Sequence, residues 1–149
     1  MSAWRKKAAE LLPELAEELS KSESPMVFWI EAEVAFSMAY NKRPINRDFI
    51  KRVYEFADWS SLHGEESQDA SQDLGTCVAV CFYEHLPTDP IVRADIPQWL
   101  TRNDVVDMME LFTYLASEAE YQELLGIYDG KIKEPPYRKP RKGKPRHIR

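Results

Sequence analysis

The sequence predicts an all-α protein: a single-domain bundle of about five helices over residues 1–130, followed by a flexible, basic tail over residues 131–149. Two observations predict this fold. Apolar residues recur at three- and four-residue steps in several segments, which is the spacing of one face of an α-helix. In addition, no run of residues alternates between apolar and polar as a half-buried strand does. The length of 149 residues suits one domain.

The first helix is expected from about Ser2 to Ser20. Its apolar stripe consists of Ala8, Leu11, Leu12, Leu15 and Leu19. Pro13 interrupts this pattern, and a proline inside a helix either kinks it or marks a new start. The polar residues Lys21–Glu23 then separate this helix from the next one.

The second helix is expected to begin at Pro25, with Ser24 as its N-cap, and to run to about Asn41. Its side chains are apolar around most of the circumference, apart mainly from Glu31, Glu33 and Ser37. A helix of this kind is usually covered on all sides. We therefore expect it to form the buried centre of the bundle.

Three further helices complete the predicted bundle. Asn46 caps the third helix, which Gly64 ends, and the polar residues Gly64–Ser71 form an exposed loop. The fourth helix is expected from about Ser71 to Leu86, where Pro87 terminates it. A proline-rich connection over Thr88–Leu100 then leads to the fifth helix, from about Thr101 to Ile127, with Thr101 and Asp104 arranged as a capping box.

The charge distribution divides the chain into two parts. Residues 1–130 contain 11 Lys or Arg and 24 Asp or Glu, a formal charge of −13, whereas residues 131–149 contain nine Lys or Arg and one Glu, a formal charge of +8. An acidic body attracts basic partners and repels nucleic acid, and a basic tail does the reverse. The proline content of the tail favours an extended, flexible segment.

Cys77, Cys81 and His85 are spaced at four-residue steps, which would place them on one helix face. Thiolates and imidazoles bind zinc, but a structural zinc site usually needs four ligands, and no second Cys or His cluster completes the set. We therefore predict no metal and two free, buried thiols. Free thiols, the lack of an apolar signal segment and the lack of a long apolar run predict a cytoplasmic protein with no membrane span.

The sequence contains no glycine-rich phosphate loop, nucleophile elbow or paired-histidine zinc motif. A nucleophilic Cys81 with His63 or His85 as its base is a catalytic arrangement that the residue types allow. Bulky apolar residues on the same face predict a buried and unreactive thiol instead. We predict that the chain is not an enzyme and needs no cofactor.

Two segments resemble a known class of protein. Tyr54–Trp59 (Tyr-Glu-Phe-Ala-Asp-Trp), an acidic loop and then Ala79–Pro87 (Ala-Val-Cys-Phe-Tyr-Glu-His-Leu-Pro) are similar to small, all-helical cytosolic immunity proteins of bacterial polymorphic toxin systems. The resemblance covers Ile45–Pro87 and consists mostly of core residues. It implies a non-enzymatic protein that binds and neutralises one cognate toxin, often one with a cationic surface.

A toxin-binding immunity protein is thus the first expectation, and the acidic body fits a basic partner. A nucleic-acid-associated accessory protein acting through the basic tail is the alternative. The candidate contact residues lie in the acidic loop, in the proline-rich connection and in the tail: Glu65, Glu66, Asp69, Asp73, Asp89, Asp95, Trp99, Arg138, Lys139, Arg141 and Lys142.

Overall fold

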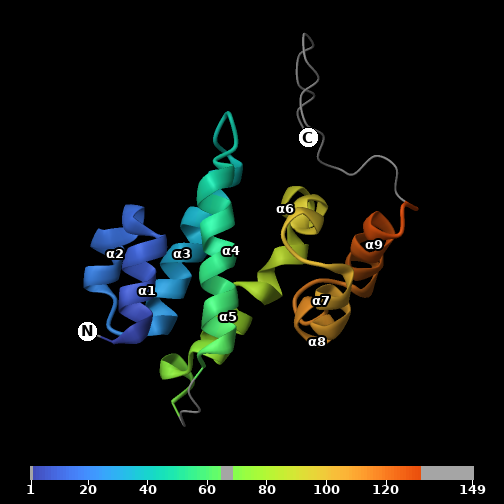
Figure 1. Cartoon of the computed structure of the whole chain (residues 1–149). Coiled ribbons are helices and arrows are strands. Elements are labelled where there is room, and N and C mark those ends of the chain that lie inside the picture. The colour runs from blue at the N-terminus through green and yellow to red at the C-terminus, as the bar shows by residue number, and fades with distance from the viewer. Residues whose placement is uncertain (1, 65–68, 132–149) are drawn as a thin grey trace. The chain divides into compact units, whose positions relative to one another are not determined.

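The computed structural model of the chain describes residues 2–64 and 69–131. These residues form nine α-helices and four short 3-10 helices, with no strand among them, so the all-α prediction is confirmed. The prediction of about five helices was too coarse, because three of the predicted helices are divided. The chain forms two compact units: unit 1 is Met1–Tyr83, and unit 2 begins at Glu84 (Figure 1).

The first predicted helix consists of three pieces. They are α1 (Ala3–Leu11), the 3-10 helix η1 (Pro13–Leu15) and α2 (Ala16–Lys21). Pro13 lacks the backbone N–H that would continue α1, so the chain restarts there. Arg5 links α1 to the end of α2, because its guanidinium donates hydrogen bonds to the backbone oxygens of Leu19 and Ser22.

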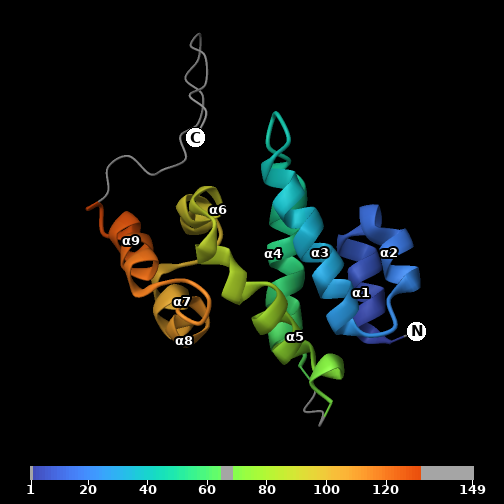
Figure 2. The same cartoon turned by 180° about the vertical axis from the view of Figure 1, so that it is seen from behind.

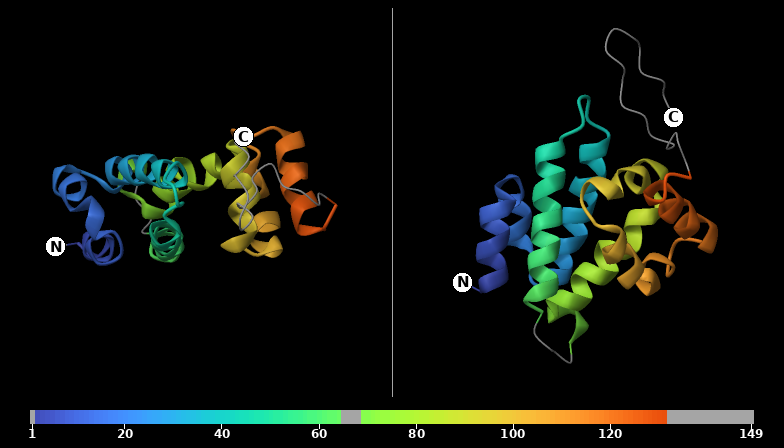
Figure 3. Two further views of the ribbon diagram at one scale, coloured as in Figure 1. Left: turned by 90° about the horizontal axis from the view of Figure 1, so that it is seen from above. Right: turned by 45° about the vertical axis from the view of Figure 1, so that its right-hand side comes forward.

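The second and third helices begin at the caps that the sequence predicts. In α3 (Pro25–Tyr40) the side chain of Ser24 accepts a hydrogen bond from Val27 N, and in α4 (Arg47–Leu62) the side chain of Asn46 accepts one from Phe49 N. Each cap satisfies a backbone N–H that has no partner within its helix. Seen from above, α3 lies on one side of unit 1, and α1 and α4 lie on the other (Figure 3, left).

The fourth predicted helix is shorter than expected. After the 3-10 turn η2 (Ala70–Gln72), α5 extends only over Leu74–Cys81, and the 3-10 helix η3 (Tyr83–Thr88) follows. Pro87 lacks a backbone N–H and so cannot continue an α-helical ladder. The helix therefore ends before His85, not at Leu86.

An aromatic cluster forms the core of unit 1. Trp29 of α3 stacks on Phe56 of α4 at 5.0 Å between ring centroids, and Phe82 lies 5.3 Å from Trp29 and 5.0 Å from Phe36. All four rings are buried. They join α3, α4 and the end of α5, and such aromatic pairs add to the stabilisation from buried area.

Unit 2 is a series of short helices. They are α6 (Pro90–Asp95), η4 (Ile96–Gln98), α7 (Arg102–Asp107), α8 (Met109–Phe112) and α9 (Glu118–Tyr128). The capping box of Thr101 and Asp104 starts α7, as predicted. A second capping box, formed by Ser117 and Glu120, starts α9 and divides the predicted fifth helix.

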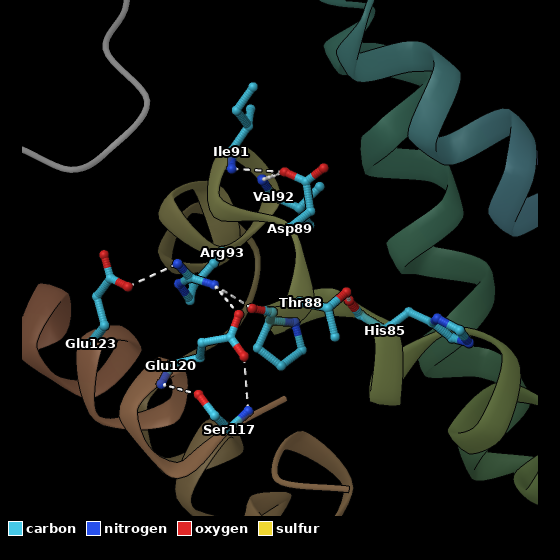
Figure 4. A network of polar contacts seen from close by, with 10 residues as sticks. His85, Thr88, Asp89, Ile91, Val92, Arg93, Ser117, Glu120 and Glu123 are labelled. Carbon is cyan, nitrogen blue, oxygen red and sulfur yellow. Dashed lines mark hydrogen bonds and ion pairs between the residues drawn. The ribbon is translucent and has the colours of Figure 1, made fainter. Parts of the chain in front are cut away.

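Arg93 is the main polar link within unit 2 (Figure 4). Its buried guanidinium donates to Pro87 O at 2.6 Å and to the carboxylates of Glu120 at 3.2 Å and Glu123 at 2.8 Å. Glu120 also accepts a bond from Ser117 N at 2.8 Å. The network thus connects α6 with the first turns of α9.

Three further sequence predictions concern membrane spans, the basic tail and the number of domains. None of the helices within residues 2–64 and 69–131 is both long and apolar enough to cross a membrane. Residues 132–149 of the predicted tail lie outside the described residues. A single domain over residues 1–130 stays a prediction, and the structure divides that range into the two units named above.

Candidate functional site

An exposed aliphatic face on α3 is the candidate functional site. Val27, Ile30, Val34 and Met38 leave 43%, 51%, 49% and 54% of their surface open to solvent. Steps of three and four residues place these four side chains on one face of the helix. We call these four residues the α3 aliphatic face, and α3 lies in front of α4 in the view of Figure 2.

The opposite face of the same helix is buried. Phe28, Trp29, Ala32 and Phe36 each expose 2% or less of their surface and pack toward the other helices of unit 1. The prediction that this helix is the buried centre of the bundle is therefore wrong for half of its circumference. Unit 1 has helices to cover only one side of α3, although both sides are apolar.

A hollow with three carboxylates adjoins one end of this face. Glu17 and Glu18 of α2, together with Glu31 of α3, line a depression of about 300 Å³ whose wall includes Val27. Lys21 is also present, and its ammonium lies 2.8 Å from a carboxylate oxygen of Glu17. The hollow, which we call the acidic hollow, therefore retains a net negative charge.

The two features together suit protein recognition. Exposed aliphatic side chains that adjoin one another form an apolar surface, which is a common feature of protein-binding faces. Side chains at three- and four-residue spacing form a ridge along a helix. Such a ridge can pack against the apolar side chains of a helix in a partner protein. The acidic hollow would accept a Lys or Arg side chain beside that ridge.

Three of the predicted contact carboxylates act as helix caps. Asp69 accepts from Ser71 N at 3.0 Å, Asp73 from Thr76 N at 3.1 Å, and Asp89 from Ile91 N at 2.8 Å. The pKa of Asp69 is lowered by its hydrogen bonds from Ser71. Each side chain thus has a local structural role, and contact with a partner stays a prediction for these residues.

Asp95 and Trp99 are brought together by the structure. The indole Nε1 of Trp99 donates to the buried carboxylate of Asp95 at 3.1 Å, one turn back along the chain. The remaining predicted contact residues lie outside the described residues: Glu65, Glu66, Arg138, Lys139, Arg141 and Lys142.

Cys77, Cys81 and His85 do not share one helix, because α5 ends at Cys81. Both thiols are buried, and His85 is exposed. Burial raises the pKa of the Cys77 thiol to about 12, with a further contribution from Cys81. Within the described residues, no group of three or more His, Cys, Asp or Glu side chains is placed to hold a metal ion.

The α3 aliphatic face was not predicted from the sequence. The apolar residues along the helix were considered, but the number of other helices that could cover them was not. A helix that is apolar on all sides needs neighbours on all sides. Besides α3 itself, the described part of unit 1 contains the α-helices α1, α2, α4 and α5, and α1 packs against α4 as well as against α2. The small number of helices available to pack around α3 could have indicated that one of its faces is exposed.

The comparisons with known proteins assign no family. A scan of the chain against protein-family models found no match, and searches of curated proteins and of solved structures found none either.

Proposed function

We propose that the chain is a non-enzymatic protein-binding module that docks its partner on the α3 aliphatic face, and that the partner is a bacterial toxin which this binding neutralises. The observation that supports a binding role is the row of four aliphatic side chains, each at least 43% exposed, on one face of a helix whose other face is core. The toxin as partner is supported by the resemblance of Ile45–Pro87 to immunity proteins.

The charge of the chain supports a basic partner. The acidic hollow places Glu17, Glu18 and Glu31 beside the apolar row. Residues 84–130 add to the negative charge of the body, because they contain ten Asp or Glu and two Arg, a formal charge of −8, whereas residues 131–149 have a formal charge of +8. Both arginines, Arg93 and Arg102, are already paired with carboxylates of the same unit. Such a field speeds association with a cationic surface.

A second copy of this chain is a poorer occupant of the α3 aliphatic face. A symmetric dimer would bury the same surface of both copies. Glu31 lies beside the row, and Glu17 and Glu18 lie close to its end, so two copies would bring carboxylates together. Like charges at an interface are unfavourable, whereas a basic partner would neutralise them.

The test is neutralisation of the toxin encoded beside this chain. Co-expression of the wild-type chain should restore growth, and the two purified proteins should form a one-to-one complex. The Ile30→Asp variant should lose both effects, because it buries a carboxylate in the apolar part of the interface. Failure of the wild-type chain to protect cells from that toxin would contradict the proposal.

A further inference from the structure

Unit 1 also contains a cavity that the proposed function does not use. It has a volume of about 390 Å³ and lies where the beginning of α1, the end of α4 and the beginning of α5 meet. Ala3, Trp4, Trp59 and Leu74 provide apolar wall. The volume is within the range of small-molecule sites, which are mostly apolar with a few polar groups.

Two stacked rings, those of Trp59 and His63, line one side of the cavity. Trp59 and the cavity residue His63 are nearly parallel, with an interplanar angle of 11° and centroids 4.3 Å apart. Phe56 continues the stack at 6.3 Å from Trp59 and 10° between planes. These residues are one turn apart on and just after α4, so the helix itself holds the rings in register.

The hydrogen bond of His63 determines which ring nitrogen is free. Its Nδ1 lies 2.9 Å from the backbone oxygen of Trp59. A carbonyl oxygen only accepts, so Nδ1 carries the proton, and Nε2 of the neutral ring is an acceptor. A ligand N–H group can therefore bind at this imidazole.

Two glycines shape the cavity where α4 ends. A Cβ atom on Gly64 would lie 3.0 Å from the backbone N of Gly75, which is tighter than ordinary packing allows. The absence of a side chain lets the end of α4 approach the beginning of α5 closely. The described residues that line the cavity include Gln72 as a further hydrogen-bonding side chain but no Lys or Arg.

We propose that this cavity binds an uncharged, planar nitrogen heterocycle, with the purine base of a nucleoside as the chemical class. Flat apolar and aromatic walls suit a planar ring. His63 Nε2 accepts from an N–H of the base, and the amide of Gln72 can donate and accept. None of the described lining residues is a cation, so they offer a phosphate no counter-charge; Lys7, whose Nζ lies 6.0 Å from the centroid of the Trp59 ring, is not one of them.

The indole N–H signals of the four tryptophans allow ligand binding at the cavity to be tested by NMR. Trp4 and Trp59 line the cavity, Trp29 is in the core of unit 1, and Trp99 is in unit 2. Titration of the full chain with adenosine should shift the indole N–H signals of Trp4 and Trp59 in a saturable way and leave the other two unchanged. Ribose should shift none of the four signals.

Variants locate the binding. Ala3→Leu extends a side chain at the cavity wall and should weaken adenosine binding about tenfold or more, and His63→Phe, which keeps the stack but removes the acceptor, should also weaken it. Ala9→Leu, an exposed position on the same helix, should bind like the wild type. The proposal is overturned by the absence of a saturable shift, by equal shifts of all four signals, by wild-type affinity of Ala3→Leu, or by tighter binding of AMP than of adenosine.

Discussion

Arg93 of α6 and Glu123 of α9 form a 2.8 Å ion pair in which the arginine side chain is 7% exposed and the glutamate side chain is 30% exposed. The same guanidinium contacts Glu120 of α9. α6 and α9 both belong to unit 2, which is built from short helices. Short helices gain little stability by themselves and depend on contacts of this kind.

Replacement of Arg93 by Met should therefore destabilise the protein by about 2–4 kcal/mol, because Glu120 and Glu123 lose their counter-charge and Pro87 O loses its donor. Urea unfolding followed by circular dichroism measures this change. Arg102→Met is the matched control, since Arg102 is more exposed in its pair with Asp129. Equal loss of stability in the two variants would show that the Arg93 network has no special role.

Glu14 should make the stability of unit 1 depend on pH. Hydrogen bonds from Arg52 lower the pKa of Glu14 below its ordinary value of 4.5. A carboxyl with a lowered folded-state pKa stabilises the protein fully above its unfolded-state pKa, and this contribution is lost as the pH falls through the folded-state pKa. Arg52 also donates to Leu11 O, so the pair joins the end of α1 and η1 to α4.

We therefore expect Glu14→Gln to reduce the free energy of unfolding by about 0.5–1 kcal/mol at neutral pH, because the pair is partly exposed. The difference from wild type should disappear in acid, below the lowered pKa of Glu14. Thermal unfolding across a pH series measures it. Glu55→Gln, at an exposed position on α4, is the control. A Glu14→Gln deficit that persists in acid would rule out this ion pair as its source.

Cys77 should react slowly with thiol reagents. Burial raises the pKa of its thiol to about 12, so the reactive thiolate is scarce near neutral pH. In a Cys81→Ala background, iodoacetamide should modify Cys77 slowly in the native protein and rapidly in urea, as measured by mass spectrometry. Rapid modification of the native protein would instead point to an accessible, activated cysteine.

Local sequence features predicted the helix starts well. Ser24, Asn46 and Thr101 were expected as caps, and all three accept the hydrogen bonds of a cap. A helix cap depends on residues within one turn of each other, so the residue types that form it can be recognised in the sequence. The break before α9 was missed, although Ser117 and Glu120 form the same motif, because the apolar stripe through residues 105–125 favoured one continuous helix.

Packing between helices was less predictable. The exposed side of α3 depends on where the other helices of unit 1 lie, and an apolar pattern along one helix does not contain that information. The cavity beside Trp59 and His63 depends in the same way on the approach of Gly64 to Gly75. Both candidate sites therefore became visible only in three dimensions.

The proposed binding of a toxin at the α3 aliphatic face can be measured by calorimetric titration of the purified toxin with matched variants of this chain. Val34→Asp should weaken binding at least about tenfold, because it places a carboxylate in the apolar row. Leu62→Asp makes the same type of change at a side chain of α4 that is 73% exposed and should bind like the wild type. Wild-type affinity of the Val34→Asp variant, with its helical content intact, would contradict the claim.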